Sequence, residues 1–247
     1  MKKNMPALIL GIFLVLLWQF IAMGIDAAYI LPSPLQILVK LWQLKEILLL
    51  VHLPATMGVT FLGLLISVVL GVFLSVIMDS NKNIENALYP IIIASQTIPT
   101  TAIAPLFVLW FGYSIWSKVL VTILITFFPI AITVYDGLKS TKREMEELLI
   151  TYGANKKDIF IKLKFPTALP YFFSAIKMAI PMSIIGAAIA EWLGAQSGLG
   201  YFSKRMMTQL DGAGVFAPVV LLSFVAMISV AIINMIEKKL ITWRKEI

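Results

Sequence analysis

The chain is a succession of long apolar stretches separated by short polar segments. Apolar stretches of about twenty residues occur at roughly 6–25, 58–78, 89–111, 116–135, 170–190 and 215–236. A helix needs about twenty residues to cross the hydrocarbon core of a bilayer, because each residue adds only about 1.5 Å of length. The pattern therefore predicts an all-α integral membrane protein, in which residues 1–247 form one transmembrane domain with six spanning helices.

The polar segment between the first two stretches has a periodicity of its own. Pro32 and Pro34 prevent the first helix from continuing, and apolar residues then recur at helical spacing from Leu35 to Leu49. We expect an amphipathic helix here, lying at the outer surface of the membrane.

The second stretch carries small residues four positions apart, which places them on one face of the expected helix. They are Gly63, Ser67, Gly71 and Ser75. Small residues on one face allow the backbone of a neighbouring helix to approach closely. We interpret this face as a packing surface with no chemical role.

The third stretch is interrupted by prolines and by a cluster of polar side chains. Pro90, Pro99 and Pro105 each remove a backbone hydrogen bond, so we expect a kinked helix that faces the protein interior or a water-filled path. The polar cluster consists of Ser95, Gln96, Thr97, Thr100 and Thr101. With Ser183 on the fifth stretch, this cluster is a candidate lining for a substrate path. The alternative is that the hydroxyl groups only bond their own backbone.

Two ionisable residues interrupt the fifth stretch. Lys177 is about two helical turns from one end, and we expect its amine to reach the membrane surface there. Glu191 lies at the other end and needs a partner or water, because an isolated carboxylate at membrane depth is costly. We expect Glu191 and Trp192 near the outer mouth of the path, followed by glycines that permit a tight reversal.

Composition excludes a soluble globular domain and several kinds of chemistry. Hydrophobic residues make up 60% of the chain, charged residues make up 13%, and the mean hydropathy is +0.94. With no cysteine and one histidine, the sequence offers no disulfide, no Cys-based metal site and no histidine cluster. It also lacks a G-x-x-x-x-G-K-[ST] phosphate loop. We therefore expect no cofactor, no bound metal and no enzymatic activity in this chain.

The formal net charge of +7 comes from short basic clusters between the apolar stretches, which argues against a nucleic-acid-binding face. With six spans, one side of the membrane receives 14 Lys and Arg residues and the other side receives 5. The larger group contains Lys2, Lys3, Lys82, the seven basic residues of 139–164, Lys238, Lys239, Arg244 and Lys245. The positive-inside rule then predicts a multi-pass cell membrane protein with both termini and the central loop in the cytoplasm.

The central loop, residues 139–166, has the pattern of a helix, a turn and a second helix. Glutamates and the LLITY sequence predict a first short helix that ends at Gly153. Asn155 predicts the start of a second helix, which we expect to end before Pro166. A charged helix-turn-helix on a membrane surface is a candidate docking element, and the alternative is a solvated loop with no partner.

The spacing in this loop resembles the E-A-A-x-x-x-G-x9-I-x-L-P signature of importer-type ABC permeases. Glu147, Gly153 and Pro166 match it, whereas leucines replace the two alanines and phenylalanine replaces the last leucine. The segments ILPSP, SQTIP, APLFVLWFGY, FFPI, EWLGA and GLG follow the order found in permeases of nitrate, sulfonate, taurine and thiamine-precursor importers. The likeness covers nearly the whole chain.

This resemblance implies that the loop is a coupling helix seated on a separate cytoplasmic ATPase. The residues implied at that contact are Glu147, Gly153, Ala154, Leu163 and Pro166. The resemblance also implies a second copy of this chain and an extracytoplasmic substrate-binding protein. SQTIP, FFPI and EWLGA are most similar to the permease for hydroxymethylpyrimidine-type thiamine precursors, which implies a small polar organic substrate.

Two alternatives to a thiamine-precursor permease remain. Val59 stands where sulfonate and taurine permeases usually carry an arginine, which counts against an anionic substrate, but sulfonate, taurine or nitrate is the alternative within the family. A secondary transporter or channel without an ATPase is the alternative from another class. Such proteins usually contain ionisable relays or paired broken helices at membrane depth, whereas here only Lys177 and Glu191 qualify.

Overall fold

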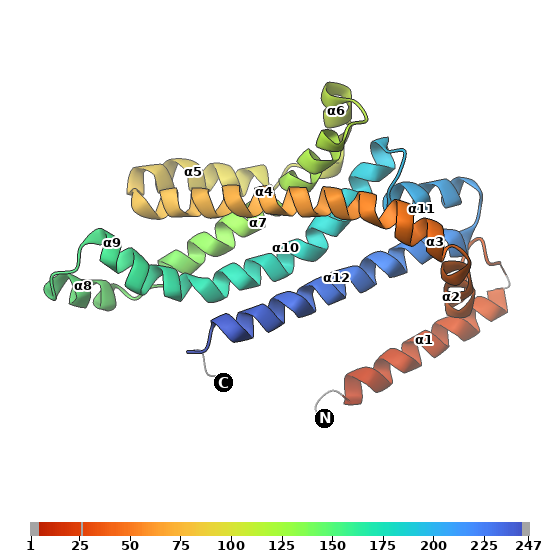
Figure 1. The fold of residues 1–247 in the computed structure, drawn as a ribbon, viewed down its shortest axis with the longest axis horizontal. Coiled ribbons are helices and arrows are strands. Elements are labelled where there is room, and N and C mark those ends of the chain that lie inside the picture. Colours follow the sequence, from red (N-terminus) through yellow and green to blue (C-terminus); the bar gives the residue numbers. More distant parts are fainter. Residues whose placement is uncertain (1–4, 26, 244–247) are drawn as a thin grey trace.

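The computed structural model describes residues 5–25 and 27–243, which form helices with no strand among them (Figure 1). The α-helices are α1 (Met5–Ile25), α2 (Pro34–Gln43), α3 (Lys45–Ile47), α4 (Leu53–Ser80), α5 (Lys82–Ser95), α6 (Thr100–Phe111), α7 (Ile115–Lys139), α8 (Arg143–Thr151), α9 (Lys156–Ile159), α10 (Phe165–Gly194), α11 (Leu199–Thr208) and α12 (Gly212–Leu240). Two π-helical stretches, η2 (Leu48–His52) and η3 (Phe160–Lys164), lead into α4 and α10. The predicted all-α membrane fold is thereby confirmed.

The centre of the bundle is formed by α4, α7 and α10, which run side by side along its long axis (Figure 1). A Cβ added at Gly71 of α4 would lie 2.8 Å from Ile130 Cγ2 of α7, so only glycine allows this approach. The Ser75 hydroxyl donates to the Ala131 carbonyl of α7 at 2.6 Å. The small-residue face predicted on α4 is confirmed as a helix-packing surface.

Five helical segments are long and apolar enough to cross a membrane, and the pair α5 and α6 would supply a sixth. The two helices of this pair meet at an angle of 94°, so the single kinked helix that we expected over 89–111 is wrong. Pro99 explains where the chain breaks. It lacks an N–H and disfavours helical geometry at Ile98, and it stands directly before α6.

We expected the second helix of the central loop to end before Pro166, and this expectation is wrong. Helix α9, η3 and α10 form one helical segment of 39 residues, Lys156–Gly194. In η3 the Phe165 N–H bonds the Phe160 carbonyl, five residues back, and this wider turn precedes the proline. Proline is tolerated in the first turn of a helix, so α10 continues through Pro166. The same arrangement of η2 before Pro54 extends the second span to Lys45–Ser80.

The end of the bundle that carries α2 and α11, called here the α2–α11 end, contains more helix than the sequence suggested. The amphipathic segment forms α2, whose first turn is fixed by a capping box at Ser33. Helix α11 occupies part of the segment expected to be a tight reversal, and Leu199 and Phe202 pack with Leu48 of η2. No pattern in the sequence indicated α11.

Helix α2 is tied to the start of α12 by an ion pair. The Lys40 amine lies 2.6 Å from Asp211 Oδ2, and the Gly214 N–H donates to Asp211 Oδ1 at 2.9 Å. Partial burial opposes the charged form of Asp211, but these two partners outweigh it and hold the pKa of its carboxyl below the usual range.

Lys177 has a partner that the sequence pattern did not indicate. Its amine donates to Glu237 Oε2 at 2.7 Å, and Glu237 lies in the last turn of α12. A nearby carboxylate lowers the cost of an amine in an apolar segment.

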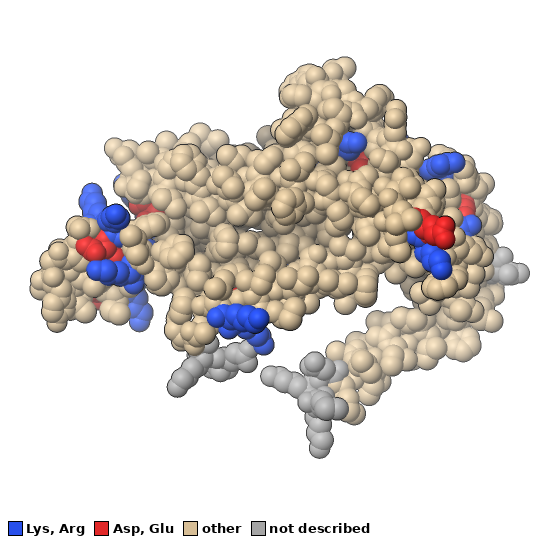
Figure 2. Space-filling view, in the orientation of Figure 1, with Lys and Arg blue, Asp and Glu red and all other residues tan. Residues whose placement is uncertain are grey.

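Charged side chains gather mainly at the left and right ends of the molecule in Figure 2, and a further basic patch lies near the end of α12, whose last turn carries Lys238 and Lys239. One of these two ends is the α2–α11 end, and the other, called here the α8 end, carries α8 and α9 (Figures 1 and 2).

Helix α1 lies beside α12, where the Trp18 and Phe216 rings are 5.9 Å apart. The basic residues Lys2, Lys3, Arg244 and Lys245 lie outside the described residues.

Candidate coupling segment and substrate path

The predicted turn of the central loop is confirmed in detail. Gly153 has a φ of +82°, which favours glycine. The Ala154 N–H bonds the Leu149 carbonyl at 3.0 Å and the Gly153 N–H bonds the Ile150 carbonyl at 2.9 Å, the pattern of a Schellman C-cap. Asn155 then starts α9, because its side chain accepts the Asp158 N–H at 2.9 Å in a capping box.

This helix-turn-helix presents apolar side chains to the outside. Leu148 and Ile150 of α8 are exposed, and Tyr152 at the turn is 81% exposed. Glu147 is also exposed, and its carboxylate accepts from the Arg143 guanidinium at 2.8 Å. Exposed apolar side chains in a charged surrounding are typical of a protein-binding surface. Of the other predicted coupling residues, Ala154, Leu163 and Pro166 are half-buried.

The polar cluster on the third span lies at the break between α5 and α6. A cavity of about 270 Å³ opens there toward α7 and α10. Its lining consists of Ser95, Gln96, Ile98, Thr100, Ile103, Leu124, Ile125, Phe128, Pro129 and Met182. The cavity therefore brings together amide and hydroxyl groups from the α5–α6 break and the Phe128 ring from α7, with Met182 of α10 beside them.

Not every predicted path residue reaches this cavity. Thr97 and Thr101 are exposed outside it, and the Thr97 hydroxyl bonds the Ala94 carbonyl at 2.7 Å. Ser183 is fully buried and donates to the Ile180 carbonyl at 2.7 Å. Our placement of Ser183 opposite the polar cluster is wrong, because Met182 lines the cavity and one step along a helix turns the side chain by about 100°.

Glu191 has the partners that the sequence required. Its side chain is buried, and Oε2 accepts from the Thr56 hydroxyl at 3.1 Å and from the Gly200 N–H at 2.8 Å. The same hydroxyl accepts the Leu199 N–H at 2.8 Å, and His52 Nδ1 accepts the Gly198 N–H at 3.1 Å. These bonds join the start of α4, the end of α10 and the turn into α11 in one polar network.

Comparison with known proteins identifies the kind of protein to which this geometry belongs. A family described as "Binding-protein-dependent transport system inner membrane component" matches residues 67–242. The chain belongs to this family. Over 249 residues the permease is 51% identical to the formylaminopyrimidine transport permease protein ThiX of Halalkalibacterium halodurans, with 100% of both chains covered.

Two more distant comparisons agree with this assignment. The permease is 29% identical to the putative aliphatic sulfonates transport permease protein SsuC of Bacillus subtilis, covering 97% of this chain and 88% of that one. A crystal structure of an amino acid ABC transporter shares the fold, with a TM-score of 0.60 at 16% identity, over 77% of this chain and 91% of that one. The resemblance that the sequence motifs indicated is confirmed, and this chain is the permease subunit of an ABC importer.

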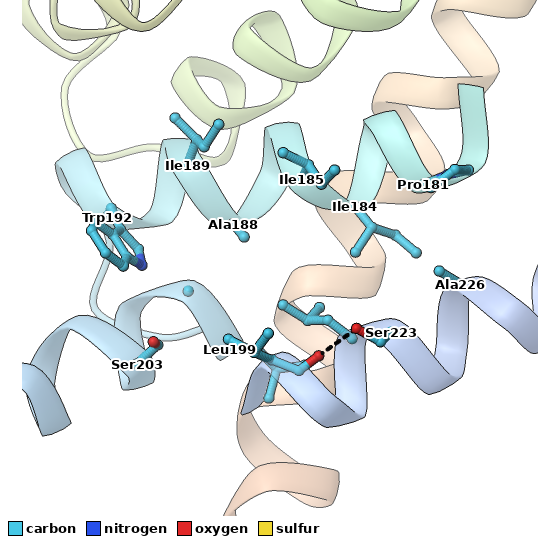
Figure 3. A pocket seen from close by; sticks show the side chains of 13 residues that line it. Pro181, Ile184, Ile185, Ala188, Ile189, Trp192, Leu199, Ser203, Ser223 and Ala226 are labelled. Carbon is cyan, nitrogen blue, oxygen red and sulfur yellow. Dashed lines mark hydrogen bonds between the residues drawn. The ribbon is translucent and has the colours of Figure 1, made fainter. Parts of the chain in front are cut away.

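A second, larger pocket of the permease does not suit a polar solute. It has a volume of about 380 Å³ and lies between α10, α11 and α12. Ile184, Ile185 and Ala188 form much of its wall (Figure 3), and the Ser223 hydroxyl is already bonded to the Val219 carbonyl at 2.9 Å. Its lining is almost entirely hydrocarbon, so it offers a polar solute few hydrogen-bonding groups.

Trp192 and Glu191 border a third cavity, of about 430 Å³, at the α2–α11 end. Lys204 and Arg205 of α11 line it as well, and the Lys204 amine donates to the Trp192 carbonyl at 2.6 Å. Sequence reasoning missed the contribution of Thr56 to this region, since a single hydroxyl in an apolar helix gives no signal. Only the long-range contact with Glu191 reveals it.

Proposed function

We propose that the permease moves a small uncharged pyrimidine into the cell. The proposed substrate resembles the formylaminopyrimidine named in the description of its 51% identical relative. A separate ATPase binds the α8 end, a substrate-binding protein delivers the solute at the α2–α11 end, and a second copy of the chain completes the path. The α8 end carries Lys82 and the seven basic residues of 139–164, and it faces the cytoplasm.

The observation that carries the substrate class is the chemistry of the cavity at the α5–α6 break. The Gln96 amide both donates and accepts hydrogen bonds, the Thr100 hydroxyl does the same, and the Phe128 ring supplies aromatic surface. In the described part of the chain, every residue that lines this cavity is uncharged. A neutral aromatic heterocycle can bind here without an unpaired charge, and it can leave again.

The alternative substrates are sulfonate, taurine and nitrate. Sulfonates and nitrate are anions, and taurine is a zwitterion that carries a sulfonate group. A cation in the path would stabilise these negatively charged groups, and the described residues that line the cavity include none. Val59, which replaces the expected arginine, is buried against Val119 and Ala187 and leaves no room for a charge. A channel or secondary transporter is not supported, because the family to which the chain belongs depends on a binding protein.

Gln96→Leu tests the path. We expect uptake of formylaminopyrimidine into cells to fall at least about tenfold, because a leucine of similar size cannot hydrogen-bond the substrate. Membrane insertion, assembly with the ATPase and basal ATP hydrolysis should be unchanged. Asn86→Leu replaces a side-chain amide by leucine at an exposed position of α5 and should transport normally. Normal uptake by Gln96→Leu, or uptake of taurine instead, would contradict the proposal.

Gly153→Val tests the docking of the ATPase. We expect the purified variant to lose most of its capture of the ATPase, because a β-branched residue at a φ of +82° distorts the turn between α8 and α9. Nothing lies within 4 Å of a Cβ at this position, so the damage should stay local and the bundle should remain folded.

Gly153→Asn is the matched control, because asparagine tolerates the left-handed conformation better than valine does. It should retain ATPase capture. If Gly153→Val binds the ATPase and transports as well as Gly153→Asn does, the loop is a solvated connection and the ATPase binds elsewhere.

A further inference from the structure

The α8 end contains a cluster of ion pairs that neither the exposed turn nor the cavity explains. Its carboxylates are Asp79 at the end of α4 and Glu85 at the start of α5. Its central amines are Lys139 of α7 and Lys164 of η3. The Asp79 side chain is only 5% exposed and that of Glu85 only 16%. Carboxylates so shielded from water must keep a partner, because an uncompensated buried charge is costly.

Lys164 ties the coupling segment to α4. Its amine donates to both carboxylate oxygens of Asp79, at 3.1 and 3.0 Å. The same amine lies 3.4 Å from Glu146 Oε1 of α8. A single, largely buried lysine therefore holds α8 and η3 against the end of α4.

Lys139 ties α7 to α5 and completes the cluster. Its amine donates to Glu85 Oε2 at 3.0 Å and lies 3.9 Å from Asp79 Oδ1. The Tyr135 hydroxyl also hydrogen-bonds to Glu85. Asp79 thus contacts both lysines, and it joins the α8 contact to the α5 contact.

Helix α5 leads from this cluster to the candidate substrate path. It starts at Lys82, and Gln96, which caps its other end, lines the cavity at the α5–α6 break. Between its ends, Ile92 packs with Met78 of α4 and Tyr135 of α7 in one buried cluster. Helix α5 is continuous through Pro90, and this packing allows a displacement of its first turn to reach the cavity.

We propose that Lys164, Asp79 and Lys139 form an ion-pair relay through which a movement of α8 is transmitted to α5 and then to the cavity. The proposal rests on the proposed docking of the ATPase at α8. These side chains are positioning residues and touch no substrate. Lys139 lies within reach of two carboxylates, so α5 can shift while each buried charge keeps a partner.

The experiment uses the absence of cysteine from the natural chain. A cysteine introduced at Ile98, which lines the cavity and is partly exposed, reports its accessibility to a small thiol reagent. In the assembled permease–ATPase complex, we expect ATP to change the labelling rate of Ile98→Cys. Adding Lys164→Met should bring the ratio of the rates with and without ATP to about one, because the two ends are no longer coupled.

Controls separate a relay from a simple loss of structure. Lys164→Met should retain ATPase capture and basal ATP hydrolysis, and Lys164→Arg, which can still pair with Asp79, should keep the ATP-dependent ratio. Lys239→Met removes an exposed lysine from the last turn of α12 and should change nothing. Asp79→Asn should match Lys164→Met, and the double variant should be no worse than either single variant, because the pair acts as a unit.

Several results would overturn the relay. They are an Ile98→Cys that ignores ATP, a ratio unchanged by Lys164→Met, additive losses in the double variant, or loss of ATPase capture in Lys164→Met. If the Lys164→Met permease itself fails to fold or insert, Lys164→Gln takes its place, and a normal ratio in that variant rejects the need for the charge. Failure of the docking proposal looks different, since Gly153→Val would then retain ATPase capture whatever the Lys164 variants show.

Discussion

Gly198→Ala is expected to disrupt the α2–α11 end of the permease and abolish uptake. Gly198 has a φ of +119° and a ψ of 159°, a conformation that is almost restricted to glycine and costs other residues about 1–3 kcal/mol. An added Cβ would overlap the Glu191 carboxyl group. That carboxyl would have to leave its bonds with Thr56 and Gly200, at about 1–3 kcal/mol for each buried group left without a partner.

Gly112→Ala is the matched control for this variant. Gly112 also has a conformation that favours glycine, with a φ of +64° and a ψ of −161°, but nothing lies within 4 Å of its Cβ position. Gly112→Ala is therefore destabilised only by the unfavourable backbone conformation and by no steric overlap. In purified protein the Tm of Gly198→Ala should fall well below that of Gly112→Ala. Equal Tm values would mean that the Glu191 network does not constrain the turn into α11.

The parts of the fold that the sequence predicts well are those with local causes. A run of about twenty apolar residues predicts a span wherever it occurs, because the bilayer requires that length. The turn at Gly153 and the helix start at Asn155 follow from the backbone preferences of two residues. The small-residue face of α4 likewise follows from a spacing of four.

The errors concern features that depend on contacts distant in the sequence. Prolines do not reveal whether a helix bends, breaks or passes through, so the break at Pro99 and the continuity through Pro166 were both misjudged. Ser183 was assigned to the path from its polarity, although one helical step separates it from the lining residue Met182. The Lys177 amine pairs with the Glu237 carboxylate, sixty positions later in the chain, and no local pattern indicates that pair.

The orientation of the permease in the membrane can be tested with single cysteines. We expect a membrane-impermeant thiol reagent to label Gln196→Cys, at the α2–α11 end, in intact cells. In cells that produce the permease without its ATPase, it should label Tyr152→Cys, at the turn after α8, only after the cells are opened. Both side chains are exposed, and the natural chain contains no cysteine, so each signal comes from one known site. Tyr152 suits this purpose better than Asn155, whose side chain caps α9.

The expected difference is close to all or none, because an impermeant reagent either reaches a side of the membrane or does not. The physical reason for the orientation is the excess of Lys and Arg at the α8 end, since basic residues next to spans are retained in the cytoplasm. Labelling of Tyr152→Cys but not of Gln196→Cys in intact cells would mean that the permease has the opposite orientation in the membrane. A cytoplasmic ATPase could not then reach α8, and the ion pairs of Lys164 would have to serve the stability of the bundle rather than the transmission of movement.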